Sequence, residues 1–167
     1  MTTTLRRAEP ADVPALLDIT REGFETYRAF APEGWEPPDM ANSHVVAIED
    51  VATWFLAEDD GEPVAHVLLI PATRSREPID DPRLGHVMQL FVRRSHWGTG
   101  VARSLHAAML EEAAQRGFTH LRLLTPAGQR RARRFYEREG WQVHDEREDA
   151  SFGFPLVEYR RSCPTPS

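Results

Sequence analysis

The sequence contains no lysine, because all 20 of its basic residues are arginines. Chemistry that depends on a lysine nucleophile is therefore excluded. A P-loop is excluded as well, since its lysine must reach the phosphates of a bound nucleotide. The formal net charge of −6 argues against broad nucleic-acid binding, which needs a basic face, and we expect no nucleic-acid partner.

Cysteine is almost absent, with Cys163 as the single thiol. One thiol forms neither a disulfide framework nor a CxxC motif, which favours a reducing compartment, and we expect the cytoplasm. The histidines lack the spacing of metal ligands, so we expect no metal site.

Long apolar runs are also missing. The longest, VLLIPA at 67–72, is far too short to span a membrane, and the first ten residues lack the apolar core of a signal peptide. We therefore expect neither membrane insertion nor export.

What remains is an ordinary globular composition, with 41% hydrophobic and 28% charged residues in a chain of 167. A chain of this length buries a core without disulfides or a structural metal. The prediction is one domain over 3–162 followed by a short tail over 163–167.

The first helix is predicted after Pro10, which suits a first helical turn. Apolar residues then recur at helical spacing. The expected inward stripe consists of Val13, Leu16, Leu17, Thr20 and Phe24.

A strand at 86–92 is apolar on nearly every residue, which predicts burial on both faces. With the helix predicted at 101–117 and the next strand at 119–125, it forms a strand–helix–strand unit, whose strands must be parallel. The fold class is therefore α/β (α+β), a mixed sheet with helices on both sides. The other expected elements are a short first strand, a helix piece at 39–50, strands at 53–58 and 63–71, a short helix at 129–140, and strands at 141–148 and 153–161.

Two glycines one residue apart follow the central strand, in the sequence RRSHWGTGVARSL of 93–105. They fit either a tight strand-to-helix turn or an anion site, and spacing alone leaves both open. A dinucleotide fingerprint does not match, because position 103 is an arginine where a third glycine is needed. The anion site that remains is a pyrophosphate cradle, formed by the backbone N–H groups of 97–103 and the start of the next helix.

This segment resembles the signature of the GCN5-related N-acetyltransferases, L-x-V-x-P-x-x-[QR]-x-x-G-x-[GA]. Two positions differ: Arg94 stands where the family has proline, and Trp97 where it has glutamine or arginine. The matching residues are Leu90, Val92, Gly100 and Ala102.

A second block, QRRARRFYEREGW at 129–141, resembles a later segment of the same family, N-x-x-A-x-x-[FL]-Y-E-x-x-G-[FW]. Gln129 stands where asparagine is usual. The matching residues are Ala132, Phe135, Tyr136, Glu137, Gly140 and Trp141. Two blocks in the right order are more specific than either block alone.

The resemblance implies a three-layer fold whose central parallel strands splay apart, and acetyl-CoA as co-substrate. The pantetheine arm would pair with the main chain at Phe91 and Val92, and Gln129 would hydrogen-bond the same arm. Tyr136 would be the general acid for the departing thiolate. The pyrophosphate would lie on Trp97, Gly98, Thr99, Gly100, Val101, Ala102 and Arg103.

The implied activity is transfer of an acetyl group from acetyl-CoA to a primary amine of a small molecule or peptide, by direct attack. The alternative is a non-catalytic acyl-CoA-binding or regulatory module, because the two motifs carry departures and no general base is evident. Candidates for the base are Gln89, His86, Glu25 and Glu33, each of which also fits a structural or solvated role.

The acceptor amine would approach over residues 24–40 and the hairpin loops. This segment carries aromatic side chains that fit either core packing or the wall of a pocket. They are Phe24, Tyr27, Phe30 and Trp35. A homodimer is the default expectation for the oligomeric state.

Overall fold

The computed structural model describes residues 3–37, 52–149 and 152–165. The helices are α1 (Val13–Glu25), α3 (Val101–Gln115) and α4 (Arg130–Arg138). The strands are β1 (Thr3–Arg7), β2 (Thr53–Asp59), β3 (Glu62–Pro71), β4 (Leu84–Val92), β5 (His120–Pro126), β6 (Gln142–Asp149) and β7 (Phe154–Ser162). The helix piece expected at 39–50 lies outside the described residues.

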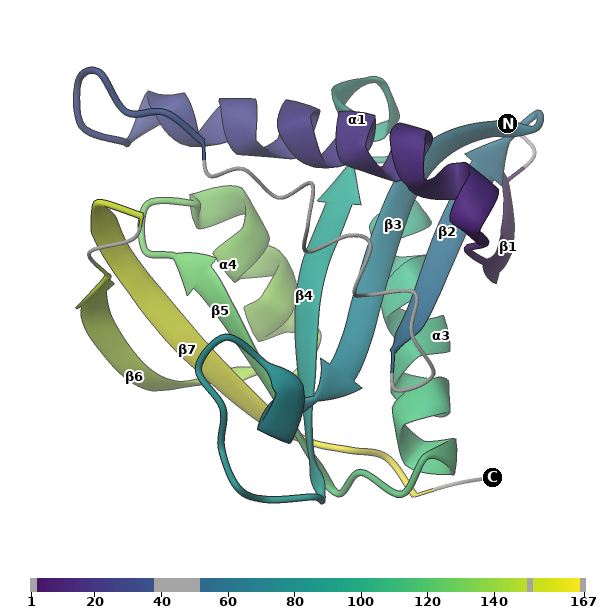
Figure 1. Cartoon of the computed structure of the whole chain (residues 1–167), viewed down its shortest axis with the longest axis vertical. Helices are drawn as coiled ribbons and strands as arrows, with labels where there is room; N and C mark the ends of the chain where they lie inside the picture. Colours follow the sequence, from purple (N-terminus) through teal and green to yellow (C-terminus); the bar gives the residue numbers. More distant parts are fainter. Residues whose placement is uncertain (1–2, 38–51, 150–151, 166–167) are drawn as a thin grey trace.

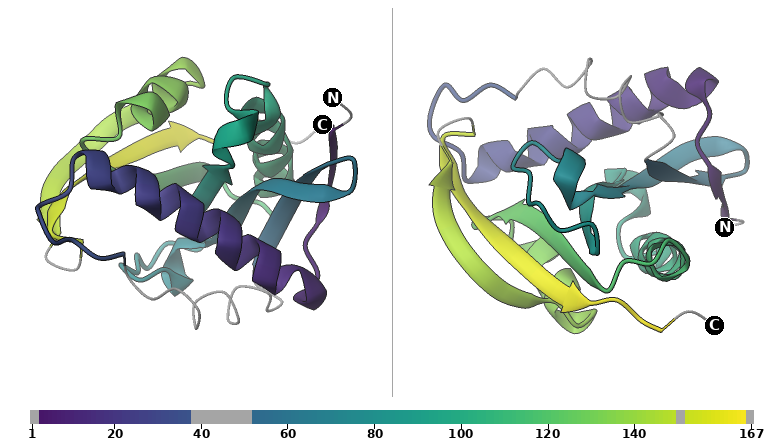
Figure 2. Two further views of the ribbon diagram at one scale, coloured as in Figure 1. Left: turned by 90° about the horizontal axis from the view of Figure 1, so that it is seen from above. Right: turned by 60° about the horizontal axis from the view of Figure 1, so that its bottom comes forward.

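The strands form one seven-stranded sheet in the order β1-β2-β3-β4-β5-β7-β6 (Figure 1). Helix α1 crosses one face, while α3 and α4 lie on the other (Figure 2). The predicted class, a mixed sheet between helical layers, is confirmed.

Strands β4 and β5 are the parallel pair, and every other neighbouring pair is antiparallel. They pair only where residues 84–87 of β4 face residues 120–123 of β5. Beyond this stretch the two strands diverge, as Figure 1 shows. The implied splay is therefore present, and from Met88 onward none of the described strands pairs with this edge of β4.

The prediction that the central strand is buried on both faces is wrong for its second half. Residues 84–87 are buried, whereas 88–92 are only partly buried. The physical reason is the splay: once β5 turns away, a neighbouring strand no longer covers β4.

Helix α1 buries Leu16 against Trp54, Leu56 and Leu68. The expected inward stripe is correct at Leu16, Thr20 and Phe24, but Ile19 is buried where Leu17 was expected. Positions 16, 19, 20, 23 and 24 share one helical face, so burial follows the helical period rather than hydrophobicity alone.

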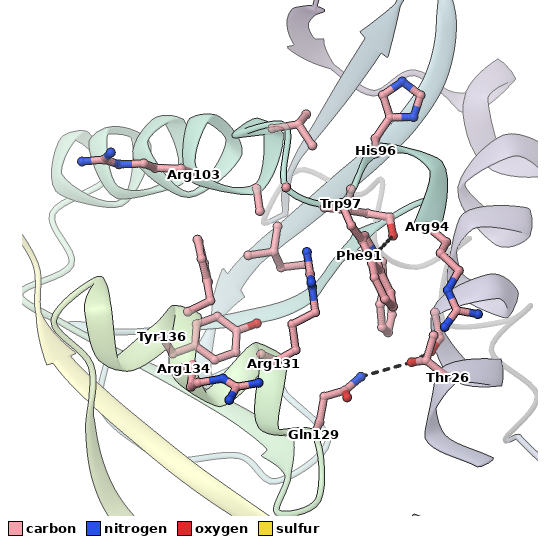
Figure 3. Close-up of a pocket in the computed structure, with 18 of the residues that line it drawn as sticks. Thr26, Phe91, Arg94, His96, Trp97, Arg103, Gln129, Arg131, Arg134 and Tyr136 are labelled. Carbon is pink, nitrogen blue, oxygen red and sulfur yellow. Dashed lines mark hydrogen bonds between the residues drawn. The ribbon is translucent and has the colours of Figure 1, made fainter. Parts of the chain in front are cut away.

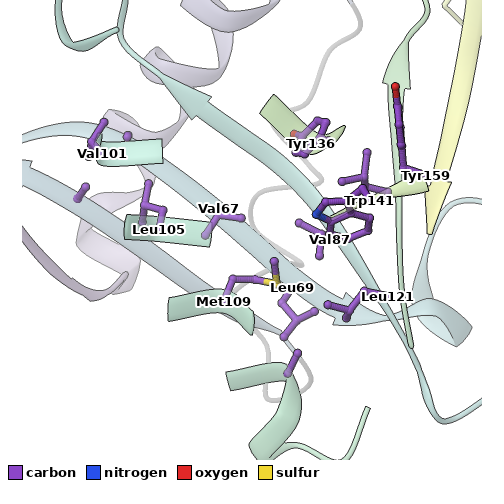
Figure 4. Packing of buried hydrophobic residues seen from close by; sticks show 14 of the residues in the cluster. Val67, Leu69, Val87, Val101, Leu105, Met109, Leu121, Tyr136, Trp141 and Tyr159 are labelled. Atoms are coloured by element: carbon purple, nitrogen blue, oxygen red, sulfur yellow. The ribbon is translucent and has the colours of Figure 1, made fainter. Parts of the chain in front are cut away.

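Helix α3 packs its apolar side chains against the opposite face of the sheet (Figure 4). Leu105 and Met109 are 0% exposed and pack in one cluster with Val67 and Leu69 of β3. Truncation of one such side chain typically costs about 2–5 kcal/mol, so this contact fixes the start of α3 beside the sheet.

The aromatic side chains near the end of α1 belong to a packed cluster. Tyr27 contacts Phe24, Phe91 and Phe154, with ring centroids 5.4, 6.4 and 6.0 Å away. Phe30 and Trp35 join the same cluster. Of the two alternatives left open by the sequence, core packing accounts for these rings.

Candidate active site

A β-bulge in β4 shapes the gap between the splayed strands. Met88 pairs with Leu68 and Phe91 with His66, so Gln89 and Leu90 together face one residue of β3. Gln89 has a positive φ of 59°, an uncommon and strained conformation for a residue with a side chain. The bulge bends the strand and turns the backbone that follows it.

The backbone of Val92 faces the gap. The N–H of Arg93 donates to the carbonyl of Val64 on β3 at 2.8 Å. Successive residues of a strand direct their backbone groups to opposite sides, so Val92 is turned away from β3 and Phe91 toward it. The main-chain position expected to hold the pantetheine arm is thus open to the gap at Val92, while Phe91 contributes its side chain.

A cleft of about 910 Å³ lies at this gap, between α1, the end of β4, the start of α3, and α4 (Figure 3). Of the eleven predicted site residues, Thr99 alone does not line it. The Thr99 hydroxyl donates to the carbonyl of His96 at 2.6 Å and so closes the loop. The ten lining residues are Phe91, Val92, Trp97, Gly98, Gly100, Val101, Ala102, Arg103, Gln129 and Tyr136.

The loop between β4 and α3 depends on its two glycines. Gly98 and Gly100 have φ angles of 75° and 87°, a region that side chains disfavour. A Cβ at either position would have no atom within 4 Å, so the need for glycine is conformational and not steric. Of the two interpretations that the sequence left open, the glycine conformations account for the tight turn and are also compatible with the anion site.

Helix α3 begins at Val101, and the three residues whose amides open its first turn, 101–103, line the cleft. These amides have no partner inside the helix and carry the positive end of the helix dipole. One member of the expected cradle differs. The Trp97 amide donates to the carbonyl of Arg94 at 3.2 Å, and so it closes the preceding 3₁₀ turn instead of facing the cleft.

The Trp97 side chain, by contrast, enters the cleft (Figure 3). Its indole N–H donates to the carbonyl of Val92 at 3.0 Å. The guanidinium of Arg131 lies 4.4 Å from the ring centroid, and that of Arg94 lies 5.1 Å away.

Arginines surround this cleft although the chain as a whole is acidic. Within the 130–134 cluster, Arg131 and Arg134 line the cleft. Arg133 instead donates to the hydroxyl of Tyr159 at 2.9 Å and to the carbonyl of Ala127, so it anchors α4 to β7. The cationic lining consists of Arg94, Arg103, Arg131, Arg134 and Arg138.

Tyr136 projects from α4 toward the cleft (Figure 3) and is 8% exposed. Its ring packs edge-on against Phe135 and Trp141. Burial raises the pKa of its hydroxyl above the ordinary value of 10, so the group stays protonated at neutral pH. The hydroxyl donates to none of the described residues, which leaves its proton available to a group in the cleft.

Gln129 lies at the N-terminus of α4 and reaches across the cleft. Its side-chain amide donates to the hydroxyl of Thr26 at 3.1 Å. Thr26 in turn donates to the carbonyl of Gly23 at 2.6 Å. The two bonds tie α4 to the C-terminal end of α1.

The candidates for the general base have different surroundings. His86 is buried and accepts a hydrogen bond from Arg122 at 3.1 Å, and burial lowers its pKa to about 3. Glu25 lines the cleft but pairs with Arg28 at 2.6 Å. Gln89 has a buried side-chain oxygen without a partner among the described residues, and Glu33 lies outside the cleft lining.

The motifs did not point to several residues that line the cleft, among them Glu22 and His96. Glu22 accepts a hydrogen bond from the backbone N–H of Arg94 at 2.8 Å, which fixes the start of the loop against α1. His96 lies 2.8 Å from a carboxylate oxygen of Asp59. The spacing of Glu22 and Glu25 on one helical face is the one sequence signal that could have indicated an acidic wall.

No cluster of three or more potential metal ligands occurs among the residues that the structure describes. The described helices also include none that is long and apolar enough to cross a membrane.

Comparison with known protein families shows that the protein is an acyltransferase. The model of the Acetyltransferase (GNAT) family matches residues 16–141, more than half of the chain, and the chain belongs to that family. The resemblance seen in the two sequence blocks is thereby confirmed, and acetyl transfer is the family's activity.

Solved structures agree on the fold. The ribosomal-protein-S18-alanine N-acetyltransferase of Escherichia coli has a TM-score of 0.75 at 15% identity, covering 99% of this chain and 97% of its own. The ribosomal-protein-alanine N-acetyltransferase of Brucella melitensis has a TM-score of 0.74 at 22% identity, and the match covers 95% of this chain and 99% of that chain. A GCN5-related N-acetyltransferase of Kribbella flavida has a TM-score of 0.73 at 19% identity, and the match covers 96% of this chain and 97% of that chain.

Proposed function

We propose that this enzyme transfers an acetyl group from acetyl-CoA to a primary amine of a small molecule or peptide, by direct attack of the amine on the thioester. The observation that carries the proposal is the convergence of the gap beside Val92, the glycine loop and Tyr136 on one cleft. The three features match the three parts of the co-substrate: pantetheine arm, pyrophosphate and thioester sulfur.

The residues present fit acetyl-CoA. The Val92 backbone would pair with the pantetheine amides as a neighbouring strand does. The amides from Gly98 to Arg103 would hold the pyrophosphate, and a cleft arginine such as Arg134 would contact further phosphate oxygens. Phe91 would contact the arm through its side chain, and Trp97 lines the cleft through its indole.

In the reaction, the neutral amine attacks the thioester carbonyl and a C–N bond forms. The carbonyl oxygen becomes an oxyanion, for which a backbone N–H facing the gap at Val92 is the proposed donor. The tetrahedral intermediate collapses as the C–S bond breaks. Tyr136 would then give its proton to the departing thiolate, and the amine proton passes to solvent or to a neighbouring base.

An amine as the acceptor fits the charge on the α1 side of the cleft, where Glu22 and Glu25 contribute carboxylates. Carboxylates attract an ammonium group to the cleft before it loses its proton. Two of the similar structures carry names that specify ribosomal-protein alanine as the acceptor, which supports a peptide amine as one arm of a substrate screen. We further propose the cytoplasm as the compartment, on the single cysteine, and a homodimer as the assembly.

The test is acetyl-CoA binding by calorimetry followed by release of CoA-SH across a panel of small amines and of peptides with free N-termini. Turnover of an amine with stoichiometric formation of the amide supports the proposal. Tight acetyl-CoA binding without turnover of any amine would favour the non-catalytic module, and no detectable binding would remove the site assignment altogether.

A further inference from the structure

The edge of β4 that faces the gap is already hydrogen-bonded by a side chain of the protein. The indole N–H of Trp97 donates to the Val92 carbonyl at 3.0 Å. This carbonyl is one of the two main-chain groups that Val92 presents to the gap. Trp97 thus occupies the position that an N–H donor of an extended ligand would take.

The indole is held in this place from both sides of the loop. Arg94 precedes it in the 3₁₀ turn, and Arg131 reaches it from α4, with guanidinium-to-ring distances of 5.1 and 4.4 Å (Figure 3). Guanidinium groups at this range attract an indole face. Trp97 therefore connects the β4–α3 loop to α4 across the cleft.

We infer that Trp97 competes with acetyl-CoA for the edge of β4, and that the indole must leave the Val92 carbonyl before a pantetheine amide can bond there. This inference rests on the proposed function, because it takes the arm to lie along Val92. Trp97 then lowers the affinity for the co-substrate and slows its association, while Gly98 to Arg103 favour binding.

The size of the effect follows from the interactions that the indole gives up. One neutral hydrogen bond and the contact with two guanidinium groups together correspond to about a tenfold change in a binding constant. Removal of the side chain in Trp97→Ala is therefore expected to lower the Kd for acetyl-CoA by about tenfold and to raise the association rate constant. Trp97→Phe loses the N–H donor but keeps a ring beside the arginines, so about a threefold decrease in Kd is expected by the same principles.

A matched control is Trp35→Phe. Trp35 also donates its indole N–H to a backbone carbonyl, that of Phe152, at 2.6 Å, but it does not line the cleft. The same substitution there removes an equivalent bond, and the Kd for acetyl-CoA is expected to stay at the parent value.

The experiment compares the four proteins by calorimetry with acetyl-CoA and by surface plasmon resonance on the immobilised proteins, with thermal unfolding to confirm that each is folded. Tighter and faster binding in the order parent, Trp97→Phe, Trp97→Ala supports the competition. Unchanged or weaker binding in Trp97→Ala overturns it and makes the indole a neutral or favourable contact. If the parent itself fails to bind acetyl-CoA, the proposed function fails instead, and the two failures are thus distinguishable.

Fluorescence gives a second readout that a merely structural role would not produce. The indole of Trp97 should leave its site between the arginines when acetyl-CoA binds, so the parent emission should change. The change should be absent in Trp97→Phe and retained in Trp35→Phe. An equal change in all three proteins would show that Trp97 stays in place and would contradict the inference.

Discussion

The side chains of Gln129 and Thr26 are joined by a 3.1 Å hydrogen bond that links α4 to α1 across the mouth of the cleft. The two residues lie 103 positions apart in the sequence. The bond gives Gln129 a role within the protein, in addition to the pantetheine contact that the resemblance implies for it.

A double-mutant cycle separates these two roles of Gln129. Gln129→Ala removes both the link to α1 and any contact with the arm. Thr26→Val removes the link and the local bond to the Gly23 carbonyl, but it leaves the Gln129 side chain in place. If Gln129 also contacts the arm, Gln129→Ala should raise the KM for acetyl-CoA about fivefold more than Thr26→Val, a difference of about 1 kcal/mol. Equal effects of the two single variants, with no further loss in the double variant, would assign Gln129 to the link alone.

Tyr136→Phe should lower kcat by about 100-fold, the lower range for loss of a general acid, while the Kd for acetyl-CoA stays unchanged. Burial raises the pKa of Tyr136 above its ordinary value, so the hydroxyl stays protonated and the parent rate should not fall through Tyr136 ionisation between about pH 7 and pH 9. The matched control is Tyr27→Phe, since burial also raises the pKa of Tyr27 but this residue does not line the cleft. Full activity of Tyr136→Phe across the pH range would rule out the general-acid role.

Gly100→Ala and Gly117→Ala form a matched pair for the loop. The two glycines have φ angles of 87° and 85°, and a Cβ at either has no atom within 4 Å. Each substitution should therefore cost about 1–2 kcal/mol of unfolding free energy through the backbone alone. Gly100 lines the cleft and Gly117 ends α3 elsewhere, so Gly100→Ala alone should also weaken acetyl-CoA binding in calorimetry. Equal binding by the two variants would place the pyrophosphate away from this loop.

Acid should destabilise the fold through buried histidines. Burial, with Arg161 as a second cause, lowers the pKa of His106 to about 4, although a Glu139 oxygen lies 3.9 Å from its Nδ1. The unfolded chain takes up this proton near pH 6.5 and the folded chain does not, so the stabilisation is complete above pH 6.5 and is lost as the pH falls toward 4. One such group contributes up to about 1.4 kcal/mol per pH unit within that window.

The measurement is urea unfolding of the parent and of His106→Gln at pH 7 and pH 5. Glutamine can still accept the hydrogen bond that Trp141 donates to His106. The variant should lose about 2 kcal/mol less than the parent between the two pH values. His120→Gln, at an exposed position, serves as the control, and equal losses in the parent and His106→Gln would refute the assignment.

Much of the fold follows from local sequence patterns. Helix α3 has apolar residues at helical spacing between two glycines, and it forms between them with Gly100 and Gly117 in left-handed conformations. The parallel β4–β5 pair follows from the strand–helix–strand order. The burial of Ile19 instead of Leu17 was not predicted. Hydrophobicity indicates which residues can be buried, but the position of the sheet decides which side of the helix faces it.

The sequence by itself determined the class of fold and the two motif blocks, because helix periodicity, turn glycines and short motifs depend on neighbours in the chain. Only the tertiary structure decided how the blocks meet. The length of the β4–β5 pairing, the contact of Arg131 with the Trp97 indole and the Gln129–Thr26 bond depend on where distant segments pack. The glycine loop was readable in advance, whereas the indole bonded to the Val92 carbonyl was not, because a sequence pattern does not give the orientation of a side chain.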